Sequence, residues 1–498
     1  MFSIPRADLV PNTAAYENEP LVKATGFREY DARWLFGPEI NLLGVQALGL
    51  GLGTYIHELG QSKIVVGHDF RSYSSSIKNA LILGLLSAGC EVHDIGLALS
   101  PTAYFAQFDL DIPCVAMVTA SHNENGWTGV KMGAQKPLTF GPDEMGKLKD
   151  IVLGAKFVER DGGKLIRVEG QAERYIANVA TRAKVTRPLK VLAACGNGTA
   201  GAFAVDALQR MGVSDVIGMD TDLDYTFPKY NPNPEDLEML HEMAKAVREH
   251  SADLAFGFDG DGDRCGVVDD EGEEIFADKI GLMLARDLAP LHPGATFVVD
   301  VKSTGLYATD PILKEHGCKV IYWKTGHSYI KRKSAETGAL AGFEKSGHFF
   351  MNAPLGYGYD CGLTAAAAVL AMLDRNPDKK LSDLRKALPV AFTSLTMSPH
   401  CADEVKYGVV ADVVKEYEDL FAAGGSILGR KITEVITVNG VRVHLEDGSW
   451  VLVRASSNKP EVVVVVESTQ SEDDMRALFR QEVKPRLGDR VGKYNQEI

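Results

Sequence analysis

The chain has 498 residues, of which 45% are hydrophobic and 24% charged, a composition typical of a soluble globular protein and a length that suits three or four domains. Asp and Glu outnumber Lys and Arg by 67 to 53, and the formal net charge of −14 argues against a nucleic-acid binder or a polybasic membrane anchor. A phosphorylated substrate stays open, because local clusters of arginine and lysine matter more than the total charge.

The seven cysteines are scattered and form no Cys-x-x-Cys pair, which favours reduced, mostly buried thiols in a cytoplasmic protein. The N-terminal sequence MFSIPRADLVPN lacks the charged-then-apolar pattern of a signal peptide. Apolar runs in the chain fall short of the roughly 20 residues that a membrane span needs. We therefore expect a cytoplasmic protein.

Three stretches share one pattern, and they begin at Lys63, Lys190 and Thr296. Each opens with a short apolar run suited to a buried parallel strand, passes through a small or polar loop into a segment of helical period, and leads to a second strand. The helical segments close with Ala-Gly-Cys, Met-Gly-Val and His-Gly-Cys, and glycine commonly ends a helix. This repeated βαβ unit favours three related α/β domains, although other α/β proteins also repeat the pattern.

The C-terminal part follows a different pattern. From Ile432 to Ser468, apolar and polar residues alternate around Asn-Gly and Asp-Gly turns, which predicts an antiparallel sheet with hairpins. The segment from Glu472 to Leu487 has the period of an amphipathic helix, so this domain is α+β. We place boundaries near residues 168, 275 and 390, which gives the domains 1–168, 169–275, 276–390 and 391–498.

A loop after the apolar segment DLAFGF carries Asp259, Asp261 and Asp263, separated by glycines. Three carboxylates this close repel one another unless a cation holds them, which disfavours a simple acidic surface turn, and the glycines let all three face one point. All-oxygen ligation selects Mg²⁺, Mn²⁺ or Ca²⁺ over zinc. An EF-hand is rejected, because Arg264 and Asp270 stand where it needs glycine and glutamate. Arg264 beside a metal suits a phosphate oxygen.

A second loop, VTASHNENGWTGVKMG, follows the apolar run IPCVAMV and presents Ser121, His122 and Lys131, which we expect in a segment that is neither helix nor sheet. Most loop serines only cap or turn. His122, Lys131 and the surrounding backbone N–H groups favour Ser121 as a nucleophile or a phosphorylated serine. Together with a metal loop, an acceptor of phosphoryl groups becomes the better interpretation, because a metal neutralises the charge on the transferring group.

Two further loops carry weaker patterns. GFEKSGHFF sets Glu344, Ser346 and His348 on one short turn, where a carboxylate beside a hydroxyl suits paired sugar hydroxyls, and a solvated turn before a strand is the alternative. RASSNKPE offers a nest of donors for a phosphate dianion, or an ordinary hairpin turn. The donors in that nest are Arg454, Ser456, Ser457 and Asn458. Other candidates for the substrate are Arg28, Tyr30, Arg33, Lys302 and His327.

With these four loops in this order, the sequence resembles the α-D-phosphohexomutases, most closely their bacterial phosphomannomutase/phosphoglucomutase branch, over essentially the whole chain. Members carry a Thr-Ala-Ser-His-Asn loop, an Asp-Gly-Asp-Gly-Asp-Arg loop, a Gly-Glu-x-Ser-Gly-His-type sugar loop and a C-terminal phosphate loop. The resemblance implies three related α/β/α domains with mixed sheets and a C-terminal α+β domain, around a central cleft whose fourth domain closes over the sugar.

The resemblance also implies an activity: interconversion of the 1- and 6-phosphates of mannose or glucose through a phosphoserine and a hexose 1,6-bisphosphate. It implies one Mg²⁺, glucose 1,6-bisphosphate as activator, and a monomer or weak dimer. The residues it assigns to catalysis are Ser121, His122, Lys131 and Arg264, and those it assigns to the metal are Ser121, Asp259, Asp261 and Asp263. It assigns to the substrate the twelve candidates at positions 28, 30, 33, 302, 327, 344, 346, 348, 454 and 456–458.

The sequence departs from the family pattern in three of the loops. Glu124 replaces a proline and Trp127 and Thr128 replace Tyr-Asn, but the spacing from Ser121 to Lys131 is preserved. Phe343 replaces a common glycine, and Ser-Ser-Asn-Lys replaces Ser-Asn-Thr or Ser-Gly-Thr. A phosphoglucosamine mutase is the nearest alternative, and it shares every loop type. Remoter ones are an aspartyl-phosphate phosphatase with Asp259 as nucleophile, and a catalytically silent binding protein.

Overall fold

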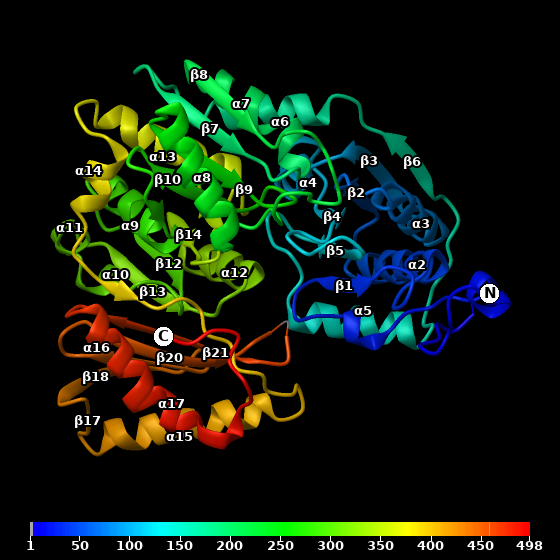
Figure 1. Ribbon diagram of the computed structural model, residues 1–498. Coiled ribbons are helices and arrows are strands. Elements are labelled where there is room, and N and C mark those ends of the chain that lie inside the picture. The colour runs from blue at the N-terminus through cyan, green and yellow to red at the C-terminus, as the bar shows by residue number, and fades with distance from the viewer. Residues whose placement is uncertain (1–2, 458) are drawn as a thin grey trace. The chain divides into compact units, whose positions relative to one another are not determined.

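The computed structural model describes residues 3–457 and 459–498 (Figure 1). The chain forms two compact units, which are described separately below. The first comprises Met1–Ala277 and Ser346–Ser382, and the second comprises Asp278–Lys345 and Asp383–Ile498.

The N-terminal part of the first unit is built on a mixed sheet in the order β1-β5-β4-β2-β3-β6. Its strands are β1 (Ala32–Leu35), β2 (Lys63–His68), β3 (Glu91–Leu97), β4 (Cys114–Val118), β5 (Trp127–Gly133) and β6 (Lys164–Arg167). Its helices are α1 (Ala14–Asn18), α2 (Leu42–Glu58), α3 (Ser74–Ser87), α4 (Ser100–Asp109), α5 (Pro142–Leu153) and α6 (Gln171–Ala180). Strands β2, β3, β4 and β6 are parallel, whereas β5 runs antiparallel to β4 and to β1.

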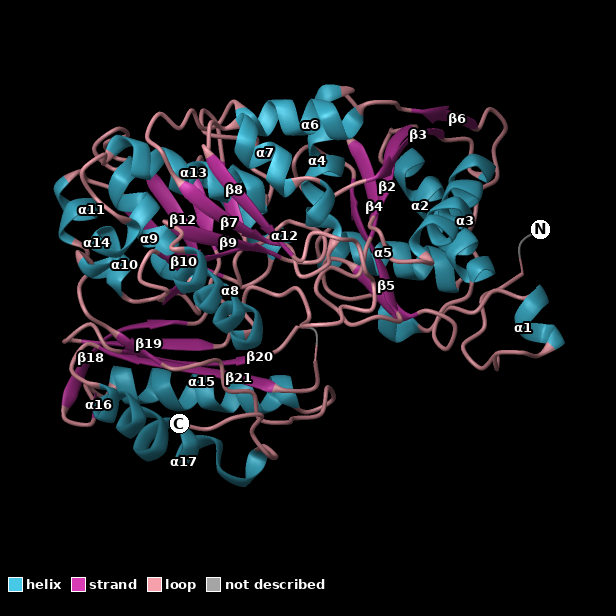
Figure 2. Cartoon of the chain, turned by 45° about the horizontal axis from the view of Figure 1, so that its top comes forward, coloured by secondary structure: helices cyan, strands magenta, loops and turns pink. Residues whose placement is uncertain are grey.

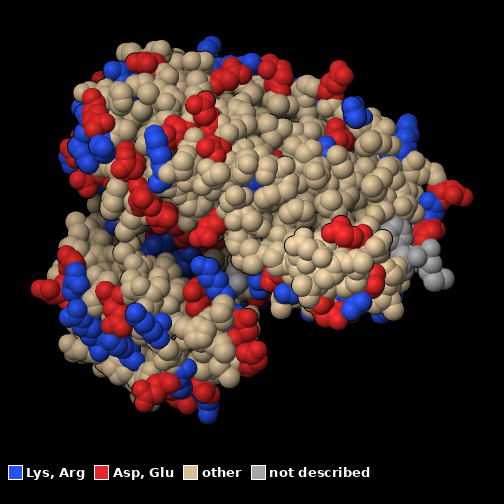
Figure 3. Space-filling model, turned by 45° about the vertical axis from the view of Figure 1, so that its right-hand side comes forward, with Lys and Arg blue, Asp and Glu red and all other residues tan. Residues whose placement is uncertain are grey.

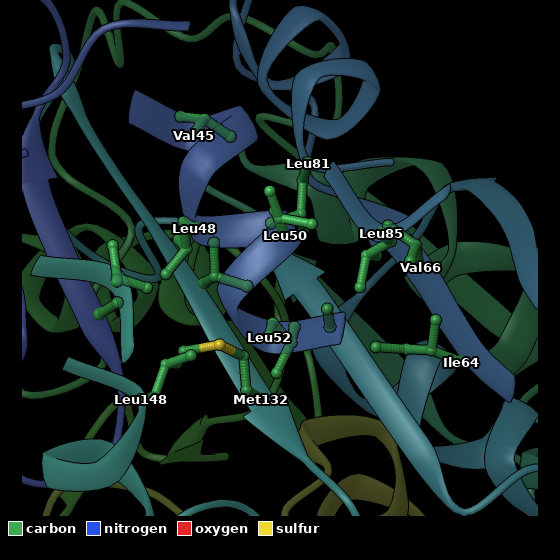
Figure 4. Packing of buried hydrophobic residues seen from close by; sticks show 14 of the residues in the cluster. Val45, Leu48, Leu50, Leu52, Ile64, Val66, Leu81, Leu85, Met132 and Leu148 are labelled. Atoms are coloured by element: carbon green, nitrogen blue, oxygen red, sulfur yellow. The ribbon is translucent and has the colours of Figure 1, made fainter. Parts of the chain in front are cut away.

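Residues of β2 alternate between two buried faces. Ile64 and Val66 join the large core beneath α2, α3 and α5, shown close up in Figure 4. Helices α2 and α3 cross at glycines, since a Cβ added at Gly49 would lie 2.2 Å from the carbonyl oxygen of Leu81. Helix α4 packs against β2 and β4. The central strands β2 and β4 are buried along most of their length, as expected for parallel strands covered by helices.

A second mixed sheet of the first unit has the order β11-β10-β9-β7-β8. Its strands are β7 (Lys190–Ala194), β8 (Asp215–Met219), β9 (Leu254–Phe258), β10 (Cys265–Asp269) and β11 (Glu274–Ile275), and its helices are α7 (Ala204–Arg210) and α8 (Leu237–His250). Strand β15 (Phe349–Met351) and helix α13 (Gly362–Arg375) complete this unit, and α14 (Leu381–Lys386) begins at its end.

The second unit contains a parallel sheet in the order β13-β12-β14 and an antiparallel sheet in the order β16-β21-β20-β19-β18-β17 (Figure 2). The strands are β12 (Thr296–Asp300), β13 (Lys319–Trp323), β14 (Ala341–Phe343), β16 (Phe392–Thr393), β17 (Ser426–Ile427), β18 (Arg430–Ile436), β19 (Val441–Leu445), β20 (Trp450–Ala455) and β21 (Val462–Ser468). The helices are α9 (Ala277–Leu288), α10 (Leu306–Thr309), α11 (Pro311–Glu315), α12 (His327–Thr337), α15 (Lys406–Ala422), α16 (Glu472–Ala477) and α17 (Lys484–Leu487).

The predicted fold class, three α/β parts and a C-terminal α+β part, is confirmed. Each repeat forms a pair of parallel strands, β2–β3, β7–β8 and β12–β13. The three glycines expected at the helix ends, Gly89, Gly212 and Gly317, all have positive φ, which is the conformation that ends a helix. The predicted C-terminal hairpins turn at Gly440 and Gly448, also with positive φ.

Three local predictions need correction. Lys131 lies on β5 and not in an irregular loop, because Gly126, with φ +98°, ends the loop early and β5 pairs with β1 and, from Val130 to Gly133, with β4. The helix of the third repeat is broken at Asp310, which caps the new helix that starts at Pro311. The C-terminal helix contains a π-helical stretch at Leu478–Val483, next to Pro485, which lacks the N–H for a regular bond.

Acidic and basic side chains are interspersed over the face of the molecule drawn in Figure 3. All seven cysteines are free thiols, and six of them are buried, as predicted. Among the described residues, no helix combines the length and apolar character needed to cross a membrane.

Candidate active site

Ser121 lies three residues beyond the carboxyl end of β4, in the first unit. Its backbone has a positive φ of 53°, which is unusual for a residue other than glycine and costs of order 1–3 kcal/mol. Its hydroxyl donates a hydrogen bond to Asp259 Oδ2 over 3.1 Å and lies 3.3 Å from Nδ1 of His122. Only 1% of Ser121 is exposed, so the strained loop holds a buried hydroxyl against an acidic residue.

The three aspartates follow the carboxyl end of β9, where the sequence predicted a metal loop. Asp259, Asp261 and Asp263 are fully buried, and one oxygen from each lies within 4.8 Å of the others. A Cβ added at Gly260 would lie 2.4 Å from the carbonyl oxygen of Ser121, so a glycine is needed where the two loops meet. The tight turn at Gly262 has φ +72°.

Lys131 reaches this loop from β5. Its ammonium donates to Asp261 Oδ2 over 2.7 Å and also to Asp263. Asp261 Oδ2 accepts two further hydrogen bonds, from Ser100 Oγ (2.6 Å) and Thr119 Oγ1 (3.0 Å). The lysine ammonium and the two hydroxyls thus come from residues 100–131, far in the sequence from the aspartates whose charge they offset.

The carboxylates fit a divalent cation. Among the described residues, Asp261 Oδ1 is buried and has no hydrogen-bond partner, which is costly unless another group binds it. Oxygen-only ligation by carboxylates suits Mg²⁺ and similar hard cations. A second group that could hold an ion comprises Asp263, His348 and Asp360.

Burial and mutual repulsion decide the ionisation of the aspartates. Burial, with Asp261 and Asp263 nearby, raises the pKa of Asp259 well above its usual range. Burial also opposes ionisation of Asp263, but Lys131 and His348 outweigh it and hold its pKa well below the usual range. Burial lowers the pKa of His122 well below that of free histidine. Lys131 keeps its proton, because Asp261 and Asp263 raise its pKa against the effect of burial.

Arg264 and His348 lie together beside the metal loop. Arg264 Nε donates to His348 Nε2 over 3.3 Å, and Arg264 Nη1 lies 3.4 Å from Glu235 Oε2. His348 Nε2 is also 3.4 Å from Asp263 Oδ1, and its Nδ1 is 3.0 Å from Ser346 Oγ. His348 thus lies between Arg264 and Asp263 of the metal loop, and the predicted sugar contacts of its turn stay a prediction.

The predicted residue Arg33 and two side chains that the sequence did not single out, Arg71 and Asn231, hold the serine loop. Arg33, one of the predicted residues, donates to the carbonyl oxygen of Ala120 over 2.9 Å. Arg71 donates to the carbonyl oxygens of Ser121 and Asn123, and Asn231 donates to that of His122. The four consecutive carbonyl oxygens of 120–123 are therefore all bonded to side chains. Of the remaining predicted N-terminal residues, Tyr30 is buried and Arg28 half-buried.

In the second unit, Asp300 connects three loops that carry predicted substrate residues. It ends β12, is fully buried, and accepts from Ser303 Oγ (2.6 Å), Thr325 Oγ1 (3.0 Å) and the backbone N–H of Lys345 (3.2 Å). Its partners lie next to the three predicted residues Lys302, His327 and Glu344. Glu344 in turn accepts from the backbone N–H of Gly326, at the start of α12.

A buried arginine of β19 fixes the Lys302 loop. Arg442 donates to the carbonyl oxygens of Val301 (2.7 Å) and Ser303 (2.6 Å), on both sides of Lys302. Its guanidinium lies over the rings of Tyr322 and Trp450, and its Nε donates to His444. Neither Asp300 nor Arg442 was predicted, although Asp300 and Asp69 both stand at the end of the first strand of a repeat.

Of the predicted phosphate nest, Ser456 and Ser457 directly follow β20. Arg454 is the fifth residue of β20, and its Nε is buried without a hydrogen-bond partner among the described residues. Ser456 is buried, Ser457 is half-buried, and Asn458 lies outside the described residues. Lys406 Nζ donates to the carbonyl oxygens of Ser456 and Lys459, so it fixes the ends of this turn.

A buried serine hydroxyl, a buried lysine and three carboxylates that suit a divalent cation are the parts of a metal-assisted phosphoryl-transfer site. Family models for phosphoglucomutase/phosphomannomutase match in the same order: α/β/α domain I at residues 24–159, domain II at 173–272, domain III at 276–392 and the C-terminal domain at 403–484.

Curated proteins and a solved structure agree with these matches. The chain is 31% identical over 470 residues to a phosphomannomutase/phosphoglucomutase of Pseudomonas putida, which covers 93% of this chain and 96% of that protein. It is 31% identical over 444 residues to a phosphoglucomutase of Neisseria meningitidis, with coverage of 89% and 92%. A family member from Burkholderia thailandensis superposes with a TM-score of 0.84 at 29% identity, covering 96% of this chain and 100% of that one. The chain belongs to the phosphoglucomutase/phosphomannomutase family.

Proposed function

We propose that the chain interconverts hexose 1-phosphates and hexose 6-phosphates of mannose, glucose or both, through a phosphoserine at Ser121 and a hexose 1,6-bisphosphate. The observation that carries the proposal is the buried Ser121 hydroxyl, 3.1 Å from Asp259 in the loop of three carboxylates. The relatives at 31% identity, named as mutases of these sugars over most of their length, support the same activity.

In the proposed reaction, the phosphoryl group moves from Ser121 Oγ to the free hydroxyl of the sugar phosphate. The Oγ–P bond breaks, a sugar O–P bond forms, and the hydroxyl proton passes to a nearby base. His122 and Lys131 are the candidates for this acid–base work, and Arg264 and Lys302 stabilise the phosphoryl charge. The bisphosphate then turns over and returns its other phosphoryl group to Ser121.

Mg²⁺ is the proposed cation, held by Asp259, Asp261, Asp263 and the phosphate on Ser121, where it would neutralise charge on the phosphoryl group. Glucose 1,6-bisphosphate is the proposed activator, because it phosphorylates Ser121 directly. Sugar contacts are assigned to Glu344 and Ser346, with further substrate contacts as predicted from the sequence.

Each of the four predicted domains is proposed to carry one of the functional loops. Residues 1–168 carry the phosphoserine, 169–275 the metal loop, 276–390 the sugar loop and 391–498 the phosphate loop. We further propose a monomer or weak dimer in the cytoplasm. The cytoplasmic location suits the free thiols, since thiols stay reduced in that compartment.

A phosphoglucosamine mutase is the second candidate, because a probable phosphoglucosamine mutase of Methanothermobacter thermautotrophicus is 28% identical over 446 residues. The two mannose- and glucose-type relatives above are more similar, and the phosphate loop lacks a Ser-Gly-Thr-Glu run. An aspartyl-phosphate phosphatase or a silent binding protein gains no support from the family assignment.

A mutase assay with Mg²⁺ and a trace of glucose 1,6-bisphosphate tests the proposal, with the 1-phosphates of mannose, glucose and glucosamine compared at equal concentration. Turnover of mannose and glucose phosphates is expected, whereas a preference for glucosamine phosphate would favour the second candidate. Ser121→Ala should abolish sustained turnover, while Ser72→Ala, at an exposed turn of the same unit, should not. Normal sustained rates in Ser121→Ala would overturn the proposal.

A further inference from the structure

We propose that Arg71 is a positioning residue, which holds Ser121 in its strained conformation for phosphoryl transfer. This inference rests on the proposed function. Arg71 lies in the loop after β2, so it comes from a different segment than the serine loop it contacts. Its Nη2 donates to the carbonyl oxygen of Ser121 over 3.0 Å and to that of Asn123 over 2.7 Å. The planar guanidinium thus binds the backbone on both sides of His122.

Asp69 holds the guanidinium in place. The two side chains form an ion pair in which neither is exposed to solvent. Asp69 also accepts from Ser74 Oγ over 2.5 Å and from the backbone N–H of Ala120 over 3.3 Å. Within the pair, Arg71 therefore donates to carbonyl oxygens of the serine loop, and Asp69 accepts from a backbone N–H of the same loop.

The burial and the geometry distinguish this pair from an ordinary ion pair. A surface pair contributes little, whereas a fully buried charge needs partners for all its polar groups. Here backbone atoms of residues 120, 121 and 123 are partners of the pair, whereas Arg71 Nε is buried without a hydrogen-bond partner among the described residues. Phe227 covers the guanidinium with its ring centroid 5.6 Å from Cζ. The charged groups are thus arranged around the segment in which Ser121 has a positive φ of 53°.

Arg71 would affect the reaction by orienting Ser121, and it takes no part in making or breaking bonds. Arg71 bonds to the carbonyl group of Ser121, the residue whose hydroxyl donates to Asp259. Displacement of a reacting group by about 1 Å can cost about 100-fold in rate. Loss of Arg71 should therefore lower kcat and the rate at which Ser121 takes up a phosphoryl group, with little effect on KM.

The test compares Arg71→Met with Arg187→Met. Arg187 also donates to three carbonyl oxygens of the first unit, those of Leu373, Asn376 and Lys379, and it is assigned no role in the site. For each variant, kcat, KM for glucose 1-phosphate and Tm are measured. The rate of Ser121 phosphorylation by glucose 1,6-bisphosphate is followed by intact mass. We expect kcat and the phosphorylation rate to fall about 100-fold in Arg71→Met only, with KM changed less than threefold.

Two conservative variants keep the test decisive if Arg71→Met does not fold. Arg71→Lys retains the charge but not the planar fork, so its kcat should fall about tenfold without a matching fall in Tm. Asp69→Asn should give the same split between kcat and KM. Rates within threefold of those of Arg187→Met in all three variants would overturn the inference. Absence of phosphorylation in the unmodified protein would instead overturn the proposed function.

Discussion

The ammonium of Lys131 lies 2.7 Å from Asp261 Oδ2, and both groups are almost completely buried. The same ammonium donates to Asp263, so one lysine on β5 offsets two carboxylates of the loop after β9. A divalent cation bound to these carboxylates would therefore neutralise them together with the lysine.

Lys131→Met should lower the free energy of unfolding most when no divalent cation is present. Removing one partner of a buried ion pair costs about 3–5 kcal/mol, because the other charges stay buried and unpaired. We expect the free energy of unfolding, measured by urea titration in EDTA, to fall by about that amount, and Mg²⁺ to restore part of it. Turnover should fall about 100-fold or more, since a charge at the phosphoryl site is lost.

Lys147→Met is the matched control, because Lys147 pairs with Glu58 at the surface of the same unit. A surface pair contributes less than about 1 kcal/mol, so this variant should unfold like the unmodified protein in EDTA and in Mg²⁺. Equal stability of the two variants in EDTA would contradict the role given to Lys131.

Gly260→Ala should disturb the serine loop at the carbonyl oxygen of Ser121, which also accepts from Arg71. The added Cβ would lie 2.4 Å from the carbonyl oxygen of Ser121, and the backbone must shift to relieve the overlap. We expect at least a tenfold loss of kcat and a loss of about 1–3 kcal/mol in stability, as for overpacked cores. Steady-state kinetics and urea titration measure the two effects.

Gly146→Ala provides the comparison. A Cβ at Gly146, inside α5, meets no atom within 4 Å, and alanine favours a helix by up to about 1 kcal/mol over glycine. This variant should keep its kcat and gain stability. An unchanged kcat in Gly260→Ala would mean that the loops tolerate a wider separation than the structure describes.

Local patterns were sufficient to predict the βαβ repeats, because strand burial and the glycines at helix ends depend on residues close in the sequence. They also predicted the three-aspartate loop, since its carboxylates repel one another wherever the loop lies. Arg71 and Arg442 could not be predicted in this way. Each acts on backbone carbonyl groups of a distant segment, at Ser121 and around Lys302, and any residue type provides such a carbonyl group.

The position of Lys131 shows a similar limit. Its place after Ser121 singled it out as a candidate, but the turn at Gly126 decided that the lysine stands on a strand. The aspartates at the ends of β2 and β12 offered a usable pattern, since Asp69 directly follows β2 and Asp300 is the last residue of β12, the equivalent strand of another repeat. An alignment of the repeats with each other therefore carries information that single loops do not.

His444→Gln should remove a step in the pH dependence of stability. His444 is 7% exposed and accepts a hydrogen bond of 2.7 Å from Arg442 Nε, and burial together with the charge of Arg442 lowers its pKa to about 2. In the unfolded chain the pKa of histidine is about 6.5, so only the unfolded state binds this proton between pH 6.5 and 2. Stability from the neutral imidazole is thus complete above pH 6.5 and is lost as the pH falls.

Between pH 7.5 and 5.0, this one group should lower the free energy of unfolding by about 2 kcal/mol. Glutamine keeps an acceptor for Arg442 but does not titrate, so His444→Gln should lack this part of the decrease. Urea titrations of both proteins at the two pH values measure the difference, in which contributions of other groups cancel. Identical pH dependence in the two proteins would show that His444 also binds a proton in the folded state, and that the Arg442 contact does not hold the imidazole neutral.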